Sequence, residues 1–448
     1  RVLNYSFHKA IFARRDFYLI LLKELMKRRD ADEALKRLSI SDKEFGQKIE
    51  EFLNQTPEHK VDSTAAVASI ESLVVSAYEN ARAANEKFIE PRNILIALAL
   101  SRDPETLKIF GLFKLDVVDL QEAITFGRYK NIFSGFKRLP AVLGGFANTS
   151  RFLRRRIMNR AWTARPTPTL DQFSQDLTDL AHAEKVGFLI GHEQEFDGLL
   201  NAISRAGKPN ALLVGEAGVG KSTMIAHLAF RMIKDQVPPA LFDKRLVSLE
   251  ISDLIANAPP EVLAGRLQKI AEEITLAGNI ILFIPNIHDL FRTGQNKTIS
   301  AIDIILPIAR NENIPLIGET YPREFKQFIE PRSDFLDQFE IVNVGEISEA
   351  EATRLLVYNS LIFERQYKIF ITFRAVRSAV QIAHRYLRNK VLPGSALDLL
   401  KGALSKTSQN RVKILTEDLI TQIAEGQIRI PIQKAGVNEA QKLLNLEI

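Results

Sequence analysis

Residues 1–125 carry apolar side chains at the spacing of α-helices. Leu73, Ala77 and Ala81 recur every four positions, and Ile94 and Leu98 repeat the same interval. Such spacing places the apolar side chains on one face of each helix, which can then pack against its neighbours. The stretch also contains few glycines to interrupt it. We therefore predict an all-α N-terminal domain over residues 1–125.

The two halves of this domain resemble each other. The apolar stretch 17–25 followed by 34–40 parallels the stretch 93–100 followed by 106–112. A repeated pattern of this kind indicates a duplicated helical unit. The alternative is that any two pairs of amphipathic helices look similar.

From residue 170 onward, helical stretches alternate with short apolar runs. The runs are residues 211–214, 245–249, 280–284, 316–318 and 341–344. Buried strands separated by helices predict a parallel sheet, here of five strands, covered on both faces. We expect this large α/β subdomain to span residues 171–346.

The strand pattern stops after residue 347, where three amphipathic stretches follow. They cover residues 349–363, 373–387 and 396–404, and they predict a small all-α lid over residues 347–432. Residues 433–448 follow this lid as a separate C-terminal stretch.

A basic segment, residues 126–170, separates the helical domain from the α/β subdomain. The chain has 60 Lys and Arg against 54 Asp and Glu, a net charge of +6. Residues 126–165 contain no acid, so the rest of the chain is net negative. Their ten cations are Arg128, Lys130, Lys137, Arg138, Arg151, Arg154, Arg155, Arg156, Arg160 and Arg165.

Aromatic residues are interspersed among these cations. A segment of this composition has three possible roles. It could lie on an acidic membrane surface, bind nucleic acid through phosphates and stacking, or pack against its own protein. The net negative remainder repels phosphates, which disfavours nucleic acid. We expect a cytoplasmic protein, with residues 126–165 as the candidate contact to a membrane.

The composition excludes several classes of chemistry. The chain has no cysteine, so it has no disulfide, thiol nucleophile or thiolate metal site. Its seven histidines are scattered without an H-E-x-x-H spacing, so we expect no metal other than Mg²⁺ bound with a nucleotide.

Residues 215–222 read G-x-x-x-x-G-K-S, between a predicted strand and a predicted helix. Glycines in such a loop let backbone N–H groups surround a phosphate, and the helix N-terminus adds positive potential. Lys221 is expected to reach the β and γ phosphates, and Ser222 to ligate Mg²⁺. The motif therefore predicts ATP or ADP binding with Mg²⁺, at Gly215, Glu216, Ala217, Gly218, Val219, Gly220, Lys221, Ser222 and the following Thr223.

The carboxylates that hydrolysis requires are missing from the expected place. A P-loop hydrolase needs acids at the end of a neighbouring strand to organise Mg²⁺ and to accept a proton from water. The candidate strand 280–284 ends in Pro285 and Asn286, neither of which ionises. His288 and Asp289 could substitute only if the turn were rebuilt.

Four segments resemble the Clp family of AAA+ unfoldases. Residues 167–178 resemble the family's entry into its first ATPase module, and residues 189–195 resemble the segment that lies against adenine, which implies a nucleotide contact at Ile190. Residues 392–399 resemble the part of the small domain that closes over the nucleotide, and residues 430–448 resemble the passage into a second ATPase ring. The resemblance implies a duplicated helical N-domain followed by a first AAA+ module.

The departures from the family all concern hydrolysis and threading. The family's acidic pair aligns with Pro285 and Asn286, and its paired arginine fingers align with Asp337 and Gln338. No aromatic residue occupies 258–261, where the family's pore loop aligns. The threonine pair after the fourth strand reads Thr320 and Tyr321, and a lysine of the small domain appears as Ser395.

Three functions are compatible with this pattern. In the first, the module binds ATP for assembly or regulation and hydrolyses it poorly, while ATPase activity resides in a second module. The second is an active unfoldase with a site rebuilt around Asn286, Asp289 or Arg332. The third is a non-enzymatic scaffold, with membrane contact through the basic segment. The resemblance also implies a hexameric ring, protein clients or adaptors bound by the N-domain, and a peptidase docked on a second ring.

Overall fold

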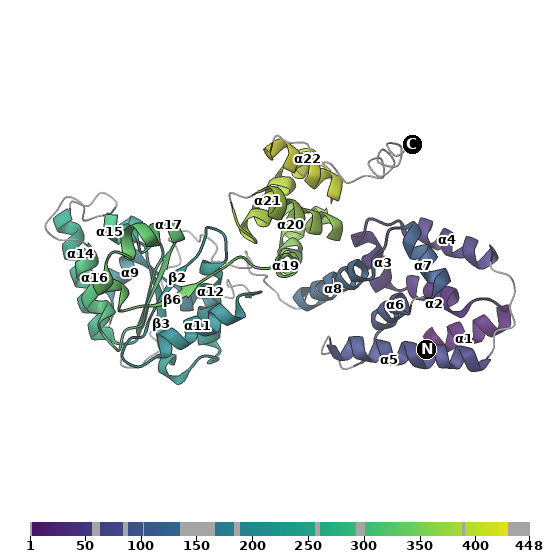
Figure 1. Ribbon diagram of the computed structural model, residues 1–448, viewed down its shortest axis with the longest axis horizontal. Helices are drawn as coiled ribbons and strands as arrows, with labels where there is room; N and C mark the ends of the chain where they lie inside the picture. The colour runs from purple at the N-terminus through teal and green to yellow at the C-terminus, as the bar shows by residue number, and fades with distance from the viewer. Residues whose placement is uncertain are drawn as a thin grey trace, which may run out of the picture. The chain divides into compact units, whose positions relative to one another are not determined.

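The computed structural model divides into two compact units, which are described separately (Figure 1). One unit comprises residues 1–137, 363–379 and 400–448, and the other comprises residues 138–362 and 380–399. The structure describes residues 2–55, 63–83, 88–101, 103–134, 166–182, 189–255, 260–292, 301–387 and 390–428.

The described N-terminal residues are helical, as the apolar spacing predicts (Figure 1). Leu19, Leu22, Phe45, Ala77 and Leu98 are buried in the core of this part. The helices are α1 (Val2–Ala13), α2 (Phe17–Met26), α3 (Arg29–Arg37), α4 (Asp42–Gln55), α5 (Ser63–Ala83), α6 (Pro91–Leu100), α7 (Pro104–Leu112) and α8 (Val117–Ser134). Helix α8 ends at Ser134.

Helix packing follows the same pattern in the two halves of this region. Helix α1 packs on α2 as α5 packs on α6, and α2 packs on α4 as α6 packs on α8. Likewise α3 contacts α8 as α7 contacts α4. Corresponding contacts between the halves are what a duplicated unit is expected to produce.

The second unit is built on a sheet with the strand order β1-β3-β4-β5-β2-β6. The strands are β1 (Ser174–Asp176), β2 (Asn210–Val214), β3 (Arg245–Leu249), β4 (Ile280–Ile284), β5 (Leu316–Thr320) and β6 (Glu340–Asn343). Strands β2 to β6 run parallel to one another. Every residue of β2, β3, β4 and β5 is buried, as expected for strands covered on both faces.

Helices cover both faces of the sheet (Figure 1). Helices α14 (Pro260–Ala277) and α16 (Ala301–Ala309) pack on one face, with Leu282 and Leu316 of the strands. Helices α10 (Leu177–His182), α11 (Glu193–Ser204) and α12 (Lys221–Ile233) pack on the other, with Phe283 and Ile317. The remaining short elements are α9 (Pro168–Phe173), η2 (Pro239–Leu241), α13 (Ile251–Ile255), α15 (Asp289–Arg292), α17 (Pro322–Glu324), η3 (Phe325–Ile329) and α18 (Ser333–Leu336).

Two strand predictions are wrong. The sheet has six strands instead of five, because β1 adds an antiparallel edge to β3. The lid is not all-α, because β7 (Phe370–Ile371) and β8 (Ile414–Leu415) form a two-stranded parallel sheet. Both escape the apolar pattern: β1 reads Ser-Gln-Asp, and β7 and β8 are two residues long. The helices of this part are α19 (Glu349–Tyr367), α20 (Phe373–Tyr386), α21 (Gly394–Gln409) and α22 (Glu417–Ile428).

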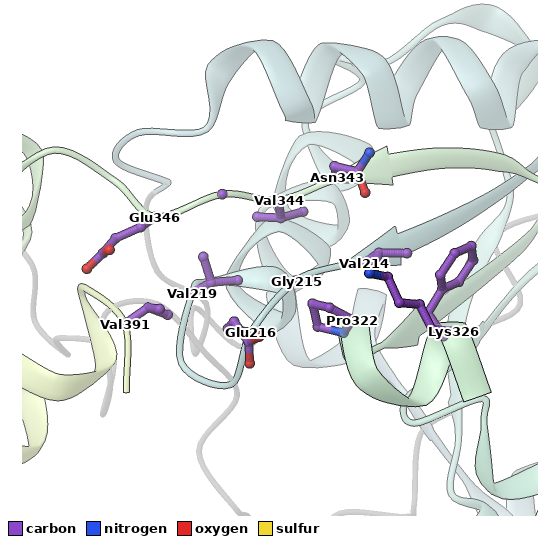
Figure 2. A pocket seen from close by; sticks show the side chains of 12 residues that line it. Val214, Gly215, Glu216, Val219, Pro322, Lys326, Asn343, Val344, Glu346 and Val391 are labelled. Carbon is purple, nitrogen blue, oxygen red and sulfur yellow. The ribbon is translucent and has the colours of Figure 1, made fainter. Parts of the chain in front are cut away.

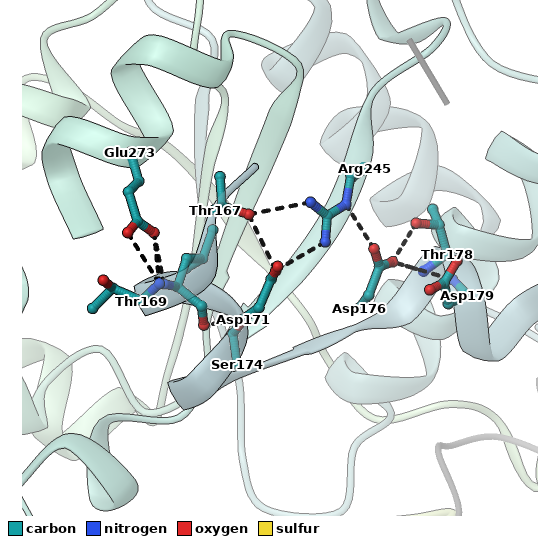
Figure 3. Close-up of polar contacts among 10 residues, drawn as sticks. Thr167, Thr169, Asp171, Ser174, Asp176, Thr178, Asp179, Arg245 and Glu273 are labelled. Atoms are coloured by element: carbon teal, nitrogen blue, oxygen red, sulfur yellow. Dashed lines mark hydrogen bonds and ion pairs between the residues drawn. The ribbon is translucent and has the colours of Figure 1, made fainter. Parts of the chain in front are cut away.

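A buried arginine ties β1 and α9 to the sheet (Figure 3). Arg245 of β3 donates from Nε to Asp176 Oδ2 at 2.8 Å and from Nη2 to Asp171 Oδ1 at 3.1 Å, and its side chain is 2% exposed. On the other side of α9, the Glu273 carboxylate accepts hydrogen bonds from the backbone N–H groups of Thr169 and Leu170. These contacts hold the start of the α/β subdomain in place.

We predict that Arg245→Ala destabilises this unit by about 3–5 kcal/mol, because it leaves two carboxylates without their buried cation. Denaturant unfolding of the wild type and the variant measures the loss. Arg205→Ala is the matched control, because Arg205 pairs with Glu340 on the surface and such pairs contribute little. Equal losses in the two variants would contradict the role of the buried network.

Candidate functional site

The loop between β2 and α12 has the backbone conformation of a phosphate-binding loop. Gly218 has a φ of +84° and Gly220 a φ of +117°, values that only glycine adopts without strain. Gly220 is the N-cap of α12, whose first residue is Lys221. The first N–H groups of a helix have no partners within the helix, so this end can bind an anion.

A cavity of about 290 Å³ opens at this loop. One part of its wall is the loop and the start of α12, and Glu319 and Tyr321 lie beside them. The rest of the lining comes from the segment before α11, from α19 and from the start of α21. The residues are Leu189, Ile190, His192, Ala217, Gly218, Val219, Gly220, Lys221, Ser222, Thr223, Glu319, Tyr321, Ile347, Leu355, Pro393, Gly394 and Leu397.

The cavity brings together most of the residues predicted to bind nucleotide. Ile190 lines the cavity together with apolar side chains of α19 and α21, and the residues from Ala217 to Thr223 all line the wall. Gly215 and Glu216 instead line a neighbouring pocket of about 350 Å³ (Figure 2). That pocket lacks Lys221 and Ser222 in its lining, so the 290 Å³ cavity is the candidate site.

The start of α21 closes against the loop. The Gly394 N–H donates to the Gly218 carbonyl at 3.1 Å. A Cβ atom placed on Gly394 would lie 2.8 Å from the Gly218 Cα, so only glycine permits this approach. On the other side, His192 Nε2 lies 2.9 Å from the Val219 carbonyl oxygen. The loop is therefore contacted on one side by the start of α21 and on the other side by His192.

Lys221 is a buried cation that faces the loop. Its Nζ donates to the carbonyl oxygens of Gly215 at 2.7 Å and Glu216 at 2.9 Å, and lies 3.7 Å from Glu319 Oε1. The Tyr321 ring centroid is 4.7 Å away. Burial lowers the pKa of Lys221, and the Glu319 carboxylate opposes that shift. The ammonium group is thus positioned where a phosphate could replace the carbonyl partners.

Glu319 is a site residue that the sequence reasoning missed. It lies in β5 with a side chain 9% exposed, and Ser222 Oγ donates to its Oε2 at 3.3 Å. Burial raises the pKa of this carboxyl, and Lys221 opposes that shift. The signal that could have identified it is an acid directly after the run 316–318, which is expected to be a strand of the same sheet as 280–284.

The residues aligned with the missing acids lie outside the cavity lining. Pro285 and Asn286 form the turn after β4, where Asn286 has a φ of +49°. His288 follows and is buried, with its Nδ1 3.1 Å from Thr320 Oγ1. Neither His288 nor Asp289 is among the residues that line the cavity.

The positions aligned with the arginine fingers carry no cation. Asp337 is exposed after α18, and the Gln338 backbone carbonyl accepts a hydrogen bond from Asn210. Arg332, the candidate for a displaced finger, forms ion pairs with Asp334 at 2.9 Å and Asp303 at 3.2 Å.

Several predictions fall on residues outside the described part. These are the basic segment from residue 135 to 165, the aligned pore positions 258 and 259, and the connection 433–448. Of the residues that the structure does describe, no helix has the length and apolar character needed to cross a membrane.

Two family matches cover the second half of the chain. Residues 211–328 match the family described as "ATPase family associated with various cellular activities (AAA)". Residues 348–444 match the family described as "AAA lid domain".

Similar curated proteins carry Clp names. The "ATP-dependent Clp protease ATP-binding subunit ClpC" of Staphylococcus aureus (strain USA300) is 26% identical over 411 residues, which cover 89% of this chain and 47% of that relative. The "Negative regulator of genetic competence ClpC/MecB" of Bacillus subtilis (strain 168) is 34% identical over 242 residues, covering 54% of this chain and 30% of that relative. The chain therefore spans about half the length or less of these relatives.

The solved structures similar to this chain include complexes of Hsp104. A structure of the S. cerevisiae Hsp104-ADP complex matches with a TM-score of 0.57 and 30% identity, covering 62% of this chain and 48% of that chain. A structure of the S. cerevisiae Hsp104:casein complex matches with a TM-score of 0.55 and 29% identity, covering 60% of this chain and 48% of that chain.

We predict that Gly394→Ala weakens ATP binding about 10-fold or more. The added Cβ forces α21 away from the loop, and overpacking of this kind costs about 1–3 kcal/mol. Calorimetric titration with Mg-ATP measures the affinity. Gly198→Ala in α11 is the control, because a Cβ there meets nothing within 4 Å. Unchanged affinity in Gly394→Ala would show that closure against the loop does not contribute to binding.

Proposed function

Because the chain belongs to the Clp family of AAA+ ATPases, we propose that this module binds ATP with Mg²⁺ and hydrolyses it poorly. Binding would then serve assembly or regulation. The observation that carries the proposal is that the residues for phosphate binding are present, whereas the acids for hydrolysis are missing. The loop presents Lys221 and Ser222 to a cavity, whereas β4 ends in Pro285 and Asn286, which do not line it.

The chain's own residues fit a magnesium nucleotide. The backbone N–H groups at the start of α12 and Lys221 would bind the phosphates, while Leu189, Ile190 and Leu397 would hold the base. Ser222 Oγ would face Mg²⁺, which neutralises phosphate charge when bound. Among the described residues, no group of three or more His, Asp or Glu side chains could hold a metal alone. Mg²⁺ usually binds through one or two protein groups plus phosphates and water.

Hydrolysis lacks both of its usual devices at this site. Asn286 can orient a water molecule but cannot accept its proton. Asp337 and Gln338 carry no positive charge toward a neighbouring subunit. An arginine finger is worth about 10³–10⁵ in kcat, so its loss alone makes turnover slow. Arg332 does not fill this role, because its guanidinium is engaged by Asp303 and Asp334.

Nucleotide binding without turnover can still organise a ring. A ligand that binds only an assembled state stabilises that state by mass action. We propose a homohexamer in which this module precedes a second, hydrolysing module beyond residues 433–448. The proposed boundaries are 1–125, 126–170, 171–346 and 347–432.

The N-terminal helices are proposed to bind protein clients or adaptors. Their surface exposes large apolar side chains on α1 and α5, among them Tyr5, Val75, Tyr78 and Phe12, which is 93% exposed. Similarity to an ATP-binding subunit of a Clp protease and to a structure of an Hsp104:casein complex supports a role in protein handling. A peptidase partner and a membrane contact through residues 126–165 are parts of the same proposal.

An active ATPase is the second candidate, and Glu319 is the observation that favours it. It places a carboxylate against Ser222, although not from the strand that usually supplies one. A non-enzymatic scaffold, the third possibility, predicts no nucleotide binding. Paired measurements of binding and turnover separate the three.

We predict that Lys221→Ala weakens Mg-ATP binding about 10- to 100-fold, because a charge-assisted hydrogen bond contributes about 1.5–3 kcal/mol. Wild-type turnover should equal that of Lys221→Ala within error. Lys234→Ala, at the exposed other end of α12, is the control and should bind like wild type. Wild-type turnover well above the Lys221→Ala background would establish an active ATPase, and absence of wild-type binding would establish the scaffold.

We also predict that Pro285→Asp combined with Asn286→Glu restores little turnover. The pair returns the acids, but the positions of Asp337 and Gln338 still lack a cation. Adding Asp337→Arg and Gln338→Arg should then raise the rate of steady-state phosphate release by about 10³-fold, the lower end of the effect of an arginine finger on kcat. Full activity from the acids alone would contradict the importance of the missing fingers.

A further inference from the structure

Glu319 lies opposite Pro285, the position where the family's first acid aligns. Strands β4 and β5 are parallel, with Phe283 opposite Ile317 and Ile284 opposite Gly318. Continued by one residue, this register places Glu319 opposite Pro285. The Glu319 carboxylate therefore lies one strand away from Pro285, at the same level along the sheet.

Glu319 also lies next to the strand that leads into the phosphate-binding loop. Strand β5 is between β4 and β2, and Glu319 pairs with Leu213. Side chains alternate between the faces of a sheet, so Glu319 shares its face with Leu213 and Ile317, where α12 packs. Its carboxylate consequently reaches Ser222 Oγ at 3.3 Å and lies 3.7 Å from Lys221 Nζ.

A triphosphate in this cavity changes the charge balance around Glu319. Lys221 is the cation that faces the carboxylate here, and a phosphate would draw its ammonium away. The carboxylate would then be buried next to further negative charge, which is strongly unfavourable without a new cation. A divalent cation shared with the phosphates removes this penalty.

We propose that Glu319 replaces, from the neighbouring strand, the carboxylate missing after β4 and holds the Mg²⁺ of bound Mg-nucleotide beside Ser222. The inference rests on the proposed function, because it assumes that nucleotide binds in this cavity. Among the described residues that line the cavity, Glu319 is the only acid, so once it holds the metal no other carboxylate there can accept a proton from water. Glu319 therefore makes ATP binding dependent on Mg²⁺ without restoring hydrolysis.

The test compares ATP affinity in MgCl₂ and in EDTA. We expect Mg²⁺ to tighten wild-type binding and Glu319→Gln to lose about 10- to 100-fold of that gain, the usual effect of removing a group that supports a metal. In EDTA the variant should bind as tightly as wild type or more tightly, because a repulsive charge is gone. Glu312→Gln, an exposed acid before β5, removes the same charge away from the site and should match wild type.

A rescue variant tests the register. Glu319→Ala should lose the Mg²⁺ effect, and adding Pro285→Asp should recover most of it, because residue 285 lies opposite residue 319 on the same face. Thermal melts confirm that each variant is folded. A gain in Mg²⁺ dependence that returns only with the acid at 285 separates metal binding from a merely structural role of Glu319.

The outcomes separate the two proposals. If wild type does not bind ATP with or without Mg²⁺, the proposed function fails. If wild type binds Mg-ATP but Glu319→Gln keeps the full Mg²⁺ effect, the proposed function stands and the role of Glu319 is overturned. If Glu319→Gln only tightens binding equally in both buffers, Glu319 is a repulsive group and the inference is likewise overturned.

Discussion

The candidate site depends on the buried ammonium group of Lys221. A buried cation is tolerated only when polar partners surround it. Here the loop carbonyl oxygens of Gly215 and Glu216 and the Glu319 carboxylate provide those partners. The left-handed glycines allow the tight loop on which this arrangement relies. A ligand that binds Lys221 must replace these contacts. A polyphosphate accompanied by a divalent cation could do so, because the phosphates would pair with the ammonium group and the cation with the Glu319 carboxylate.

The strand order explains how an acid can be lost from one strand and supplied by another. In a parallel sheet the strands end at one edge, so side chains from neighbouring strands face the same ligand. Strand β5 lies between β2 and β4, and it is therefore adjacent both to the loop and to the turn at Pro285. A carboxylate on β5 can face the metal side of the loop. The position that would activate water, at Asn286, has no such substitute among the residues that line the cavity.

The proposed module would separate nucleotide binding from nucleotide turnover. Contacts that close the cavity, such as that of Gly394 with Gly218, depend on whether a nucleotide is bound and not on whether it is hydrolysed. Ring assembly or regulation can draw on that binding free energy in every subunit without consuming ATP. The similar curated proteins are about twice as long as the matched region or longer.

Much of the fold and part of the site could be predicted because they arise from neighbouring residues. Strands β2 to β6 appear as apolar runs, and the loop motif acts within residues 215–222. Strands β1, β7 and β8 could not be found this way, since they have two or three residues and form only by pairing with distant strands. Glu319 was missed for the same reason: its partner Ser222 is 97 residues away in the chain. The glycine-rich loop and the lack of acids directly after β4 can be recognised from the sequence, because both are local patterns. That another carboxylate faces the loop follows from the fold alone, because the register between β4 and β5 sets which side chains meet there.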